Sequence, residues 1–349
     1  MASSASSRTN PSVLVVGGGS IGQRHTMNLR ALGVSKLSVS DPVHERRVAL
    51  ESQYAVTTYA LFEEALKAEH PSAVLICTPP HLHVELAIRA VESGAHVFIE
   101  KPLSNSMDEI DRLIKASESR NRIIQVGYNW RFDDGLRKIK TLLDARAIGR
   151  VLWARAETGQ YLPDWRPQLD YRQNYTARRA MGGGIILDGS HEIDYIRWLL
   201  GEVTHVYCQA GTVSDLEVDV EDTASLILTF ESGIVGEVHL DFVQRARARN
   251  CKIVGTEGSI VWDHIDGSLV VFSAGDSSWE RLELAPTPNA QYLAEIDDFM
   301  NCVNENREPL VGLDTGIRVL EIALAALESS RTNRQLEIIQ PGHRQHWNV

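Results

Sequence analysis

The stretch Val13-Leu14-Val15-Val16-Gly17-Gly18-Gly19-Ser20-Ile21-Gly22 decides the fold of the first part of this chain. Its four apolar residues predict a buried strand, and the glycines that follow predict a tight turn. A helix is expected from about Gln23 to Leu32. The G-x-G-x-x-G pattern therefore lies between a strand and a helix, which is the context of a dinucleotide-binding site.

The three glycines of this pattern have separate expected roles. Gly17 allows the sharp turn, Gly19 lets the backbone approach a pyrophosphate, and Gly22 lets the helix pack closely on the strand. Phosphate oxygens would accept hydrogen bonds from N–H groups at the start of the helix, so Ser20 and Ile21 are also expected to contact the cofactor. An ordinary glycine-rich turn is the alternative that the hexapeptide alone leaves open.

A carboxylate supports the dinucleotide interpretation. The segment 37–40 is expected to be the next strand, and Asp41 stands at its end. A carboxylate about twenty residues after the glycine turn accepts hydrogen bonds from an adenosine ribose and repels a 2′-phosphate. Asp41 therefore favours NAD over NADP, although Arg46 and Arg47 weaken that preference. The alternative is that Asp41-Pro42 only initiates a turn.

Bulk properties limit the class of protein. The chain has 349 residues, of which 43% are hydrophobic and 23% charged, and this suits a two-domain globular protein. The formal net charge of −11 excludes the strongly basic surface typical of nucleic-acid binding. Residues 1–10 are expected to be a disordered tail and not a signal peptide. The four scattered cysteines are expected to be core residues, as in a cytoplasmic protein.

Strand and helix patterns alternate up to about Gly127, which predicts a parallel sheet with helices on both faces. Ligands bind at the carboxyl ends of such strands, so residues that directly follow a strand are candidates for binding. These candidates are Gly17–Gly22, Asp41, Thr78–His83 (with Pro79), Glu100–Pro102 and Gly127–Arg131 (with Asn129). From about Val151, consecutive strands with short glycine turns predict a second, α+β domain with an antiparallel sheet.

Two segments carry residues suited to proton and oxyanion chemistry. Lys101, in Glu100-Lys101-Pro102, can donate hydrogen bonds to a substrate hydroxyl and stabilise alkoxide character. His191 can exchange a hydroxyl proton, and Asp188, three residues earlier on one expected helix, would orient it. The alternatives are a solvated lysine before a turn, and a helix-capping aspartate beside a packed histidine. Metal binding is not favoured, because the redox interpretation accounts for the glycines and Lys101 without a metal.

Arginines and aromatic rings before the second segment suit a sugar-like substrate. The region Tyr161–Arg179 contains Trp165 and Arg172, and aromatic rings pack on sugar C–H faces while arginines bind carboxylates or phosphates. Arg245, Arg247 and Arg249 alternate and would share one face of a strand. Either patch could bind an anionic sugar, and surface or subunit-contact arginines are the alternative.

The chain resembles the glucose–fructose oxidoreductase, inositol dehydrogenase and MocA family, also called Gfo/Idh/MocA. The resemblance covers nearly the whole chain and rests on a set of separate motifs. These are Gly17–Gly22 with Gln23-Arg24-His25, Thr78-Pro79-Pro80-His81-Leu82-His83, Glu100-Lys101-Pro102, Val126–Phe132, the glycine run 182–184 leading to Asp188, His191 and Asp194, and Gly312–Gly316.

This resemblance implies an α/β Rossmann domain (11–130) followed by an α+β domain with a large, mainly antiparallel open sheet (131–349). The second domain would bind substrate and build a homodimer or homotetramer. Family members oxidise or reduce a ring carbinol of a sugar, sugar nucleotide or cyclitol with NAD(P). Lys101, Asp188 and His191 match the family's lysine, aspartate and histidine, and Thr78, Pro79 and Glu100 match positions at the nicotinamide end of the cofactor.

One spacing departs from the family pattern. Most relatives have three residues between the aspartate and the histidine, whereas only Gly189 and Ser190 intervene here. Alignment from the glycine side keeps Asp188, and alignment from Arg197–Gly201 keeps His191. Two alternative functions remain open at this point: glycoside cleavage through transient sugar oxidation by tightly held NAD, and a non-catalytic NAD sensor.

Overall fold

A computed structural model describes residues 11–284 and 288–339, and tertiary contacts divide these residues into two compact units. The first unit comprises 11–103, 108–127 and 292–314, and the second comprises 104–107, 128–284, 288–291 and 315–339. The segment 292–314 therefore belongs to the first unit, whereas the division made from sequence places it in 131–349. The expected tail, 1–10, lies outside the described residues.

The first unit contains a six-stranded parallel sheet in the order β3-β2-β1-β4-β5-β6, the strand order of a Rossmann fold. Val15 of β1 lies beside Val39 of β2 on one side and Leu75 of β4 on the other. The strands are β1 (Val13–Val16), β2 (Leu37–Ser40), β3 (Thr57–Tyr59), β4 (Ala73–Ile76), β5 (His96–Glu100) and β6 (Ile124–Gly127).

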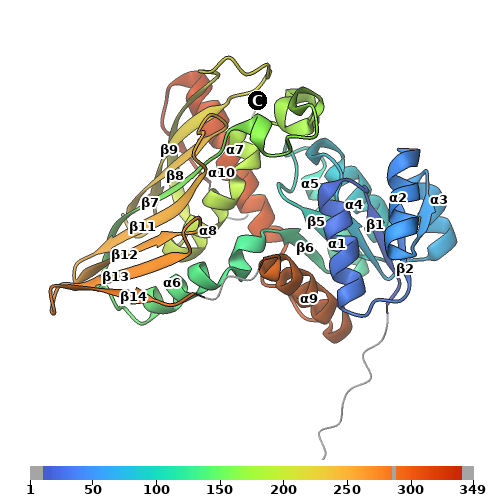
Figure 1. Cartoon of the computed structure of the whole chain (residues 1–349), viewed down its shortest axis with the longest axis horizontal. Coiled ribbons are helices and arrows are strands. Elements are labelled where there is room, and N and C mark those ends of the chain that lie inside the picture. The colour runs from blue at the N-terminus through green and yellow to red at the C-terminus, as the bar shows by residue number, and fades with distance from the viewer. Residues whose placement is uncertain (1–10, 285–287, 340–349) are drawn as a thin grey trace, which may run out of the picture. The chain divides into compact units, whose positions relative to one another are not determined.

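Helices cover this sheet, as Figure 1 shows. They are α1 (Ser20–Ala31), α2 (His44–Tyr54), α3 (Phe62–Glu69), α4 (His83–Glu92), α5 (Ile110–Arg120) and α9 (Ala290–Glu305). Helix α9 joins the core because its apolar face packs with β-strand residues, and Phe299 lies edge-on to Phe98 of β5 with ring centroids 5.8 Å apart. Helical spacing in the sequence shows that α9 has an apolar face, but it does not show which core covers that face.

The second unit is built on a nine-stranded sheet in the order β14-β13-β12-β11-β7-β10-β9-β8-β15. Every neighbouring pair is antiparallel except β10 and β7, which run parallel. The strands are β7 (Val151–Gly159), β8 (Val203–Gly211), β9 (Thr223–Phe230), β10 (Val235–Asp241), β11 (Ala248–Gly255), β12 (Gly258–Asp263), β13 (Ser268–Ser273), β14 (Ser278–Leu282) and β15 (Leu336–Glu337).

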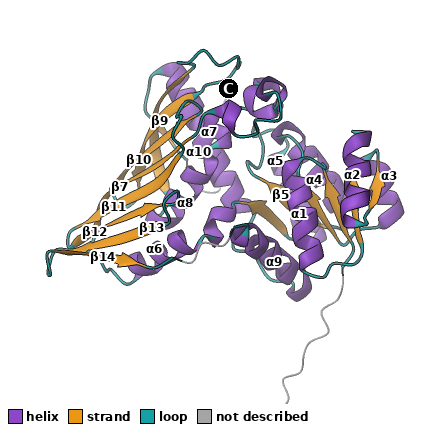
Figure 2. Cartoon of the chain, viewed as in Figure 1, coloured by secondary structure: helices purple, strands orange, loops and turns teal. Residues whose placement is uncertain are grey.

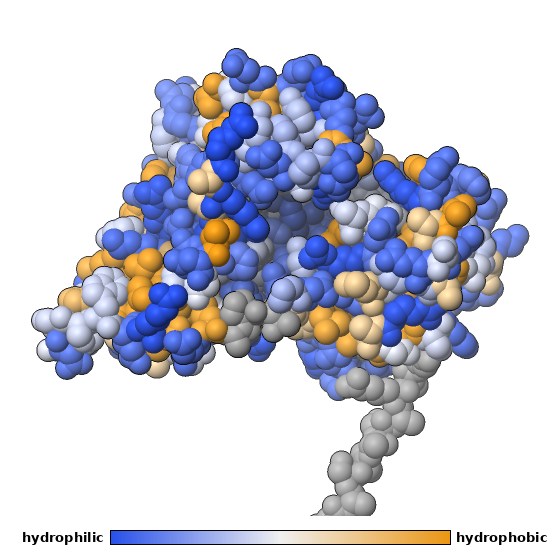
Figure 3. All heavy atoms as spheres, in the orientation of Figure 1, coloured by the Kyte–Doolittle hydropathy of each residue, from blue (hydrophilic) through white to orange (hydrophobic). Residues whose placement is uncertain are grey.

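The helices of the second unit lie along one side of this sheet (Figure 2). They are α6 (Asp134–Asp144), α7 (Ile185–Asp188), α8 (Ser190–Leu200) and α10 (Leu313–Thr332). In β9, buried Leu226 and Leu228 alternate with Ser225 and the exposed Ile227, which is the period-two pattern of a sheet with one covered face. In the view of Figure 3, the surface over this sheet carries apolar residues scattered among hydrophilic ones.

The two folds confirm the predicted class, a Rossmann domain followed by an α+β domain with a mainly antiparallel open sheet. Sequence patterning missed α6, β14 and β15. All four cysteines are buried and unbridged, as expected of core residues. Within residues 11–284 and 288–339, no helix combines the length and the apolar character that crossing a bilayer requires.

Candidate functional site

The glycine turn of the first unit is shaped by close contacts. Gly17 has φ 98°, and a Cβ at this position would lie 2.6 Å from the carbonyl oxygen of Cys77. A Cβ on Gly22 would overlap the carbonyl oxygen of Gly17. Only glycine fits these two positions, because the start of α1 lies directly against the end of β1.

Gly19 differs from its neighbours because it faces open space. It is the N-cap residue of α1, where no side chain makes a capping hydrogen bond. No neighbouring atom lies within 4 Å of the position that a Cβ would take. The first N–H groups of a helix need acceptors, and phosphate oxygens supply them where the backbone is accessible. The turn therefore fits a pyrophosphate at Gly19, with Ser20 and Ile21 in the first turn of the helix.

Asp41 lies at the end of β2, as predicted, and is only 2% exposed. Its Oδ2 accepts a hydrogen bond of 2.7 Å from the Gly18 N–H, and its Oδ1 accepts one of 2.8 Å from the Val43 N–H. Arg46 makes a longer contact of 3.4 Å with Oδ2. Asp41 thus fixes the glycine turn, and a carboxylate has acceptor positions left for a ribose hydroxyl.

The residues after β4 form a second part of the same edge of the sheet. The hydroxyl of Thr78 is buried and, within the described residues, has no hydrogen-bond partner, so it is available to a ligand. Pro79 precedes the short 3-10 helix 80–82. His83 is 1% exposed, and its ring nitrogens lie 2.7 Å from Thr78 O and 2.9 Å from Pro102 O. His83 therefore joins two loops, a placement that favours support of the cofactor site over the predicted direct contact.

Glu100 and Lys101 follow β5, and Glu100 is held on both sides. Its Oε1 lies 2.6 Å from Nε2 of the fully buried His25, and its Oε2 accepts a 3.2 Å hydrogen bond from the Lys101 N–H. The Lys101–Pro102 peptide bond is cis. His25, on α1, was quoted only as part of a family motif. The sequence places it three residues after Gly22, on the same helix, but contains no signal for its partner Glu100, 75 residues later.

In the second unit, Asp188 and His191 lie on separate short helices. The expected single helix is interrupted at Gly189, so that Asp188 ends α7 and His191 lies in the first turn of α8. Oδ1 of Asp188 accepts a hydrogen bond from the Tyr175 hydroxyl at 3.3 Å. The ring of His191 is 8% exposed and packs edge-on against Tyr128, with centroids 5.7 Å apart. Both residues are thus held by neighbours and retain some solvent access.

Asn129 and Arg131 share one 3-10 helix but have different surroundings. Asn129 is 1% exposed, and neither its Oδ1 nor its Nδ2 has a hydrogen-bond partner within the described residues. Arg131 donates from Nε and Nη2 to both carboxylate oxygens of Asp194, at 2.8 and 2.7 Å. Its donors are committed to a buried ion pair, so the structure favours a structural role for Arg131. Asn129 remains a candidate for substrate binding.

Tyr161 and Trp165 lie on the segment after β7. The guanidinium of Arg245 stacks 3.5 Å from the centre of the Tyr161 ring. Trp165 donates from Nε1 to Gln160 O at 3.0 Å and packs edge-on against Phe242. Of the three alternating arginines only Arg249 lies in β11, where it pairs with buried Glu192, so they do not share one face of a strand.

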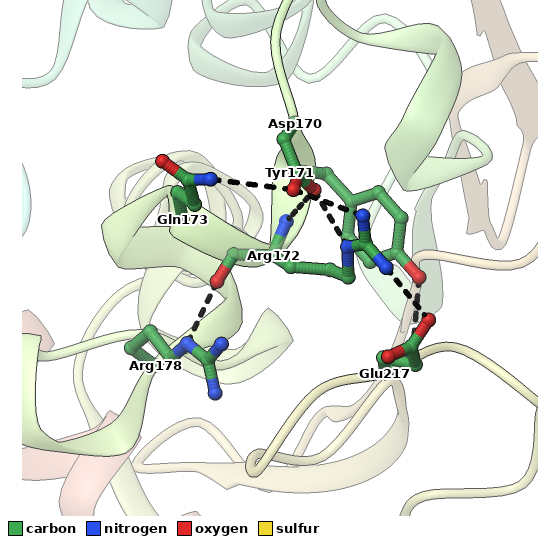
Figure 4. Close-up of polar contacts among 6 residues, drawn as sticks. All are labelled: Asp170, Tyr171, Arg172, Gln173, Arg178 and Glu217. Carbon is green, nitrogen blue, oxygen red and sulfur yellow. Dashed lines mark hydrogen bonds and ion pairs between the residues drawn. The ribbon is translucent and has the colours of Figure 1, made fainter.

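Arg172 is occupied by neighbouring acids, as Figure 4 shows. Nε and Nη2 donate to the two carboxylate oxygens of Asp170, at 2.8 and 3.0 Å, and Nη1 donates to Glu217 at 3.1 Å. The two carboxylates outnumber the single guanidinium charge. The arrangement therefore does not favour the predicted binding of an anionic substrate by Arg172, and it instead fastens the loop 170–173 to Glu217.

Known proteins match this chain over most of its length. The chain is 29% identical over 338 residues to a myo-inositol 2-dehydrogenase from Thermotoga maritima, covering 93% of this chain and 97% of that protein. It is 29% identical to a levoglucosan dehydrogenase from Pseudarthrobacter phenanthrenivorans, covering 95% and 99%. A solved structure of levoglucosan dehydrogenase in complex with NADH superposes with a TM-score of 0.86 at 24% identity, covering 95% of this chain and 100% of that one.

The Rossmann sheet, the glycine turn and the carboxylate after β2 define an NAD-binding oxidoreductase. Residues 12–128 match the oxidoreductase family with an NAD-binding Rossmann fold, and residues 136–261 match the Gfo/Idh/MocA C-terminal domain. The chain belongs to the Gfo/Idh/MocA family.

We expect Gly19→Ala to lower NAD affinity by about tenfold or more without destabilising the free protein. The added methyl group enters the open space where the pyrophosphate would approach, and it meets no protein atom. Titration calorimetry with NAD and the Tm of the free protein measure the two effects. Gly211→Ala, which also adds a methyl group to open space, is the matched control. Unchanged NAD affinity in Gly19→Ala would contradict the binding of the pyrophosphate at Gly19.

Proposed function

We propose that the protein transfers hydride between NAD and a secondary alcohol or ketone of a sugar, sugar derivative or cyclitol. The observation that carries this is that the open glycine turn after β1 and the segment Glu100-Lys101 after β5 both lie at the carboxyl edge of the Rossmann sheet. The names of the inositol and levoglucosan dehydrogenases support a polyhydroxylated ring as the substrate. NADP is the second candidate cofactor, because Arg46 lies next to Asp41 and an arginine there can accommodate a 2′-phosphate.

In this proposal, the nicotinamide ring supplies the hydride acceptor or donor when it is bound. Lys101 donates a hydrogen bond to the substrate oxygen and so stabilises its negative charge. His191 accepts the hydroxyl proton during oxidation and returns it during reduction. Asp188 orients the substrate or His191, and the Tyr175 hydroxyl holds one oxygen of that carboxylate. Asn129, with both polar atoms available, binds a further substrate hydroxyl.

A substrate panel tests this function. Sugars, uronates, cyclitols and nucleotide sugars are incubated with NAD or NADP, and nicotinamide absorbance is followed. A substrate that is deuterated at the carbinol carbon should deliver deuterium to one face of the nicotinamide. Cleavage of glycosides with NAD that survives purification and no accumulation of NADH would instead indicate transient oxidation. NAD binding without turnover of any compound would overturn the proposal and indicate a sensor.

We also propose that the protein is a homodimer or homotetramer built on the open face of the nine-stranded sheet. Trp153 and Val235 are paired neighbours on β7 and β10 and are 37% and 43% exposed, and Ile227 on β9 is 40% exposed. Charged Arg155 and Glu237 form the next same-face pair along β7 and β10, and Glu237 lies beside Ile227. Apolar side chains mixed with charges suit a face that another copy of the chain covers.

The double substitution Trp153→Glu with Val235→Glu should lower the molar mass of the assembly in light scattering, because it places carboxylates in the proposed contact. Val213→Glu is the matched control, since Val213 is 69% exposed and lies outside the named strands. A wild-type protein that is already monomeric at working concentration would contradict the proposed assembly.

A further inference from the structure

A polar depression lies at the amino ends of the strands of the first unit. Its volume is about 580 Å³. Its lining includes Ser12 and Ser72, which directly precede β1 and β4, and His96, the first residue of β5. Gly17 is five residues beyond Ser12 along an extended chain, so the depression is roughly 17 Å from the glycine turn. It is therefore distinct from the cofactor site at the opposite ends of the same strands.

The charged side chains that line this depression are all basic. Lys36, His70, His96 and Arg122 line it, and none of the thirteen described lining residues is acidic. This is unusual in a chain with a formal net charge of −11. The carboxylates next to its walls in sequence have other partners: Glu69 accepts from Tyr59, Glu92 pairs with Arg112, and Glu305 pairs with Arg307.

His96 shows that an acceptor is needed in this depression. Its side chain is 9% exposed, Nδ1 lies 3.1 Å from the Ile123 N–H, and Nε2 lies 3.1 Å from Nη1 of Arg122. Both neighbours are donors. Burial, followed by the charge of Arg122, lowers the pKa of His96 to about 4, so the ring is neutral near pH 7.

A neutral imidazole has only one acceptor nitrogen. The backbone N–H of Ile123 can only donate, so Nδ1 accepts that bond and the proton lies on Nε2. The Nε2–H of His96 and the Nη1 of Arg122 are then two donors that face each other. Arg122 is fixed in this place because its Nε donates to Arg120 O at 2.8 Å. An oxyanion that accepts from both donors would satisfy them together.

We propose that His96, Arg122 and Lys36 form a second binding site, for a phosphate group that is either free or esterified to a small molecule. The phosphate accepts from the imidazole N–H and the guanidinium, and Lys36 balances its second charge. Helices α3, α4 and α9 end near the depression, and the partial negative charge of helix carboxyl ends opposes an anion. We therefore expect an affinity in the millimolar range.

The test uses protein saturated with NAD, so that the glycine turn cannot hold the probe. Inorganic phosphate is titrated against chloride at constant ionic strength, and binding is followed by calorimetry. Glycerol phosphate is titrated in parallel with glycerol. Preference for the ester identifies a phosphorylated metabolite as the ligand, and equal affinity identifies free phosphate.

Two substitutions test the donors. His96→Asn keeps an acceptor for the Ile123 N–H but removes the donor at Nε2, and Arg122→Gln removes the guanidinium. Each should raise the Kd for phosphate by about tenfold or more. Arg120→Gln, which removes the same charge from the neighbouring helix end, should leave the Kd within about twofold. No saturable binding to the wild type, or an equal loss of affinity in all three variants, would overturn the site.

Discussion

Lys101→Met should lower kcat by about tenfold or more, while the Kd for NAD changes by less than about twofold. Methionine keeps the length of the side chain but removes the ammonium that is proposed to stabilise the substrate oxygen. The hydrogen bond that Glu100 accepts from Lys101 is donated by the backbone N–H, so the substitution keeps it. The loss should therefore fall on the chemical step and not on the placement of the loop.

Steady-state kinetics with the substrate found in the panel measure this effect, and calorimetry measures NAD affinity. Lys67→Met is the matched control, because Lys67 lies in the last turn of α3, away from the carboxyl ends of the strands. A variant at Lys101 that keeps wild-type kcat would contradict the assignment. A proportional loss of NAD affinity would instead indicate that Lys101 binds the cofactor only.

His191→Asn should lower kcat by about 10²- to 10⁴-fold, which is the usual contribution of a general acid–base group. Asparagine removes the group that can take up and return a proton, and NAD affinity should stay within about twofold. His191→Phe separates this role from packing, because a phenyl ring preserves the edge-on contacts with Tyr128 and Trp130.

Both His191 variants should lose turnover alike, although only His191→Asn removes the ring contacts. His205→Asn in β8 is the control for loss of a histidine from the same unit. If His191→Phe retained turnover while His191→Asn lost it together with a lower Tm, His191 would be a packing residue and another group would exchange the proton.

Local sequence was sufficient where one short segment contains all the determinants. The turn at Gly17 and Gly22 was predictable because the glycines follow an apolar strand and precede a helix, and Asp41 was predictable because it ends the next strand. Helix α8 ends at Leu200, directly before Gly201 (φ 102°), because glycine adopts this positive φ without steric cost. These features depend on contacts between residues that are close in sequence, or between residues at the ends of adjacent parallel strands.

Long-range partners were not predictable in the same way. Arg131 was expected to bind substrate, yet Asp194, 63 residues later, occupies its donors. Arg172 was expected to bind anions, yet Glu217, 45 residues later, holds it together with the neighbouring Asp170. An arginine has the same residue type and spacing whether its partner is a ligand or a carboxylate of the same chain.

By itself, the sequence determined that this protein has a Rossmann domain with an NAD turn, a mainly antiparallel second domain and the candidates Lys101 and His191. Strand period, glycine conformation and the order of motifs along the chain are local properties, so they can be recognised without coordinates. Only the tertiary structure decided that α9 completes the first core, that His25 holds Glu100, and that two donors converge at His96 and Arg122. Those arrangements arise when residues distant in sequence satisfy one another's apolar surface, charge and hydrogen bonds, and no single segment specifies the partner.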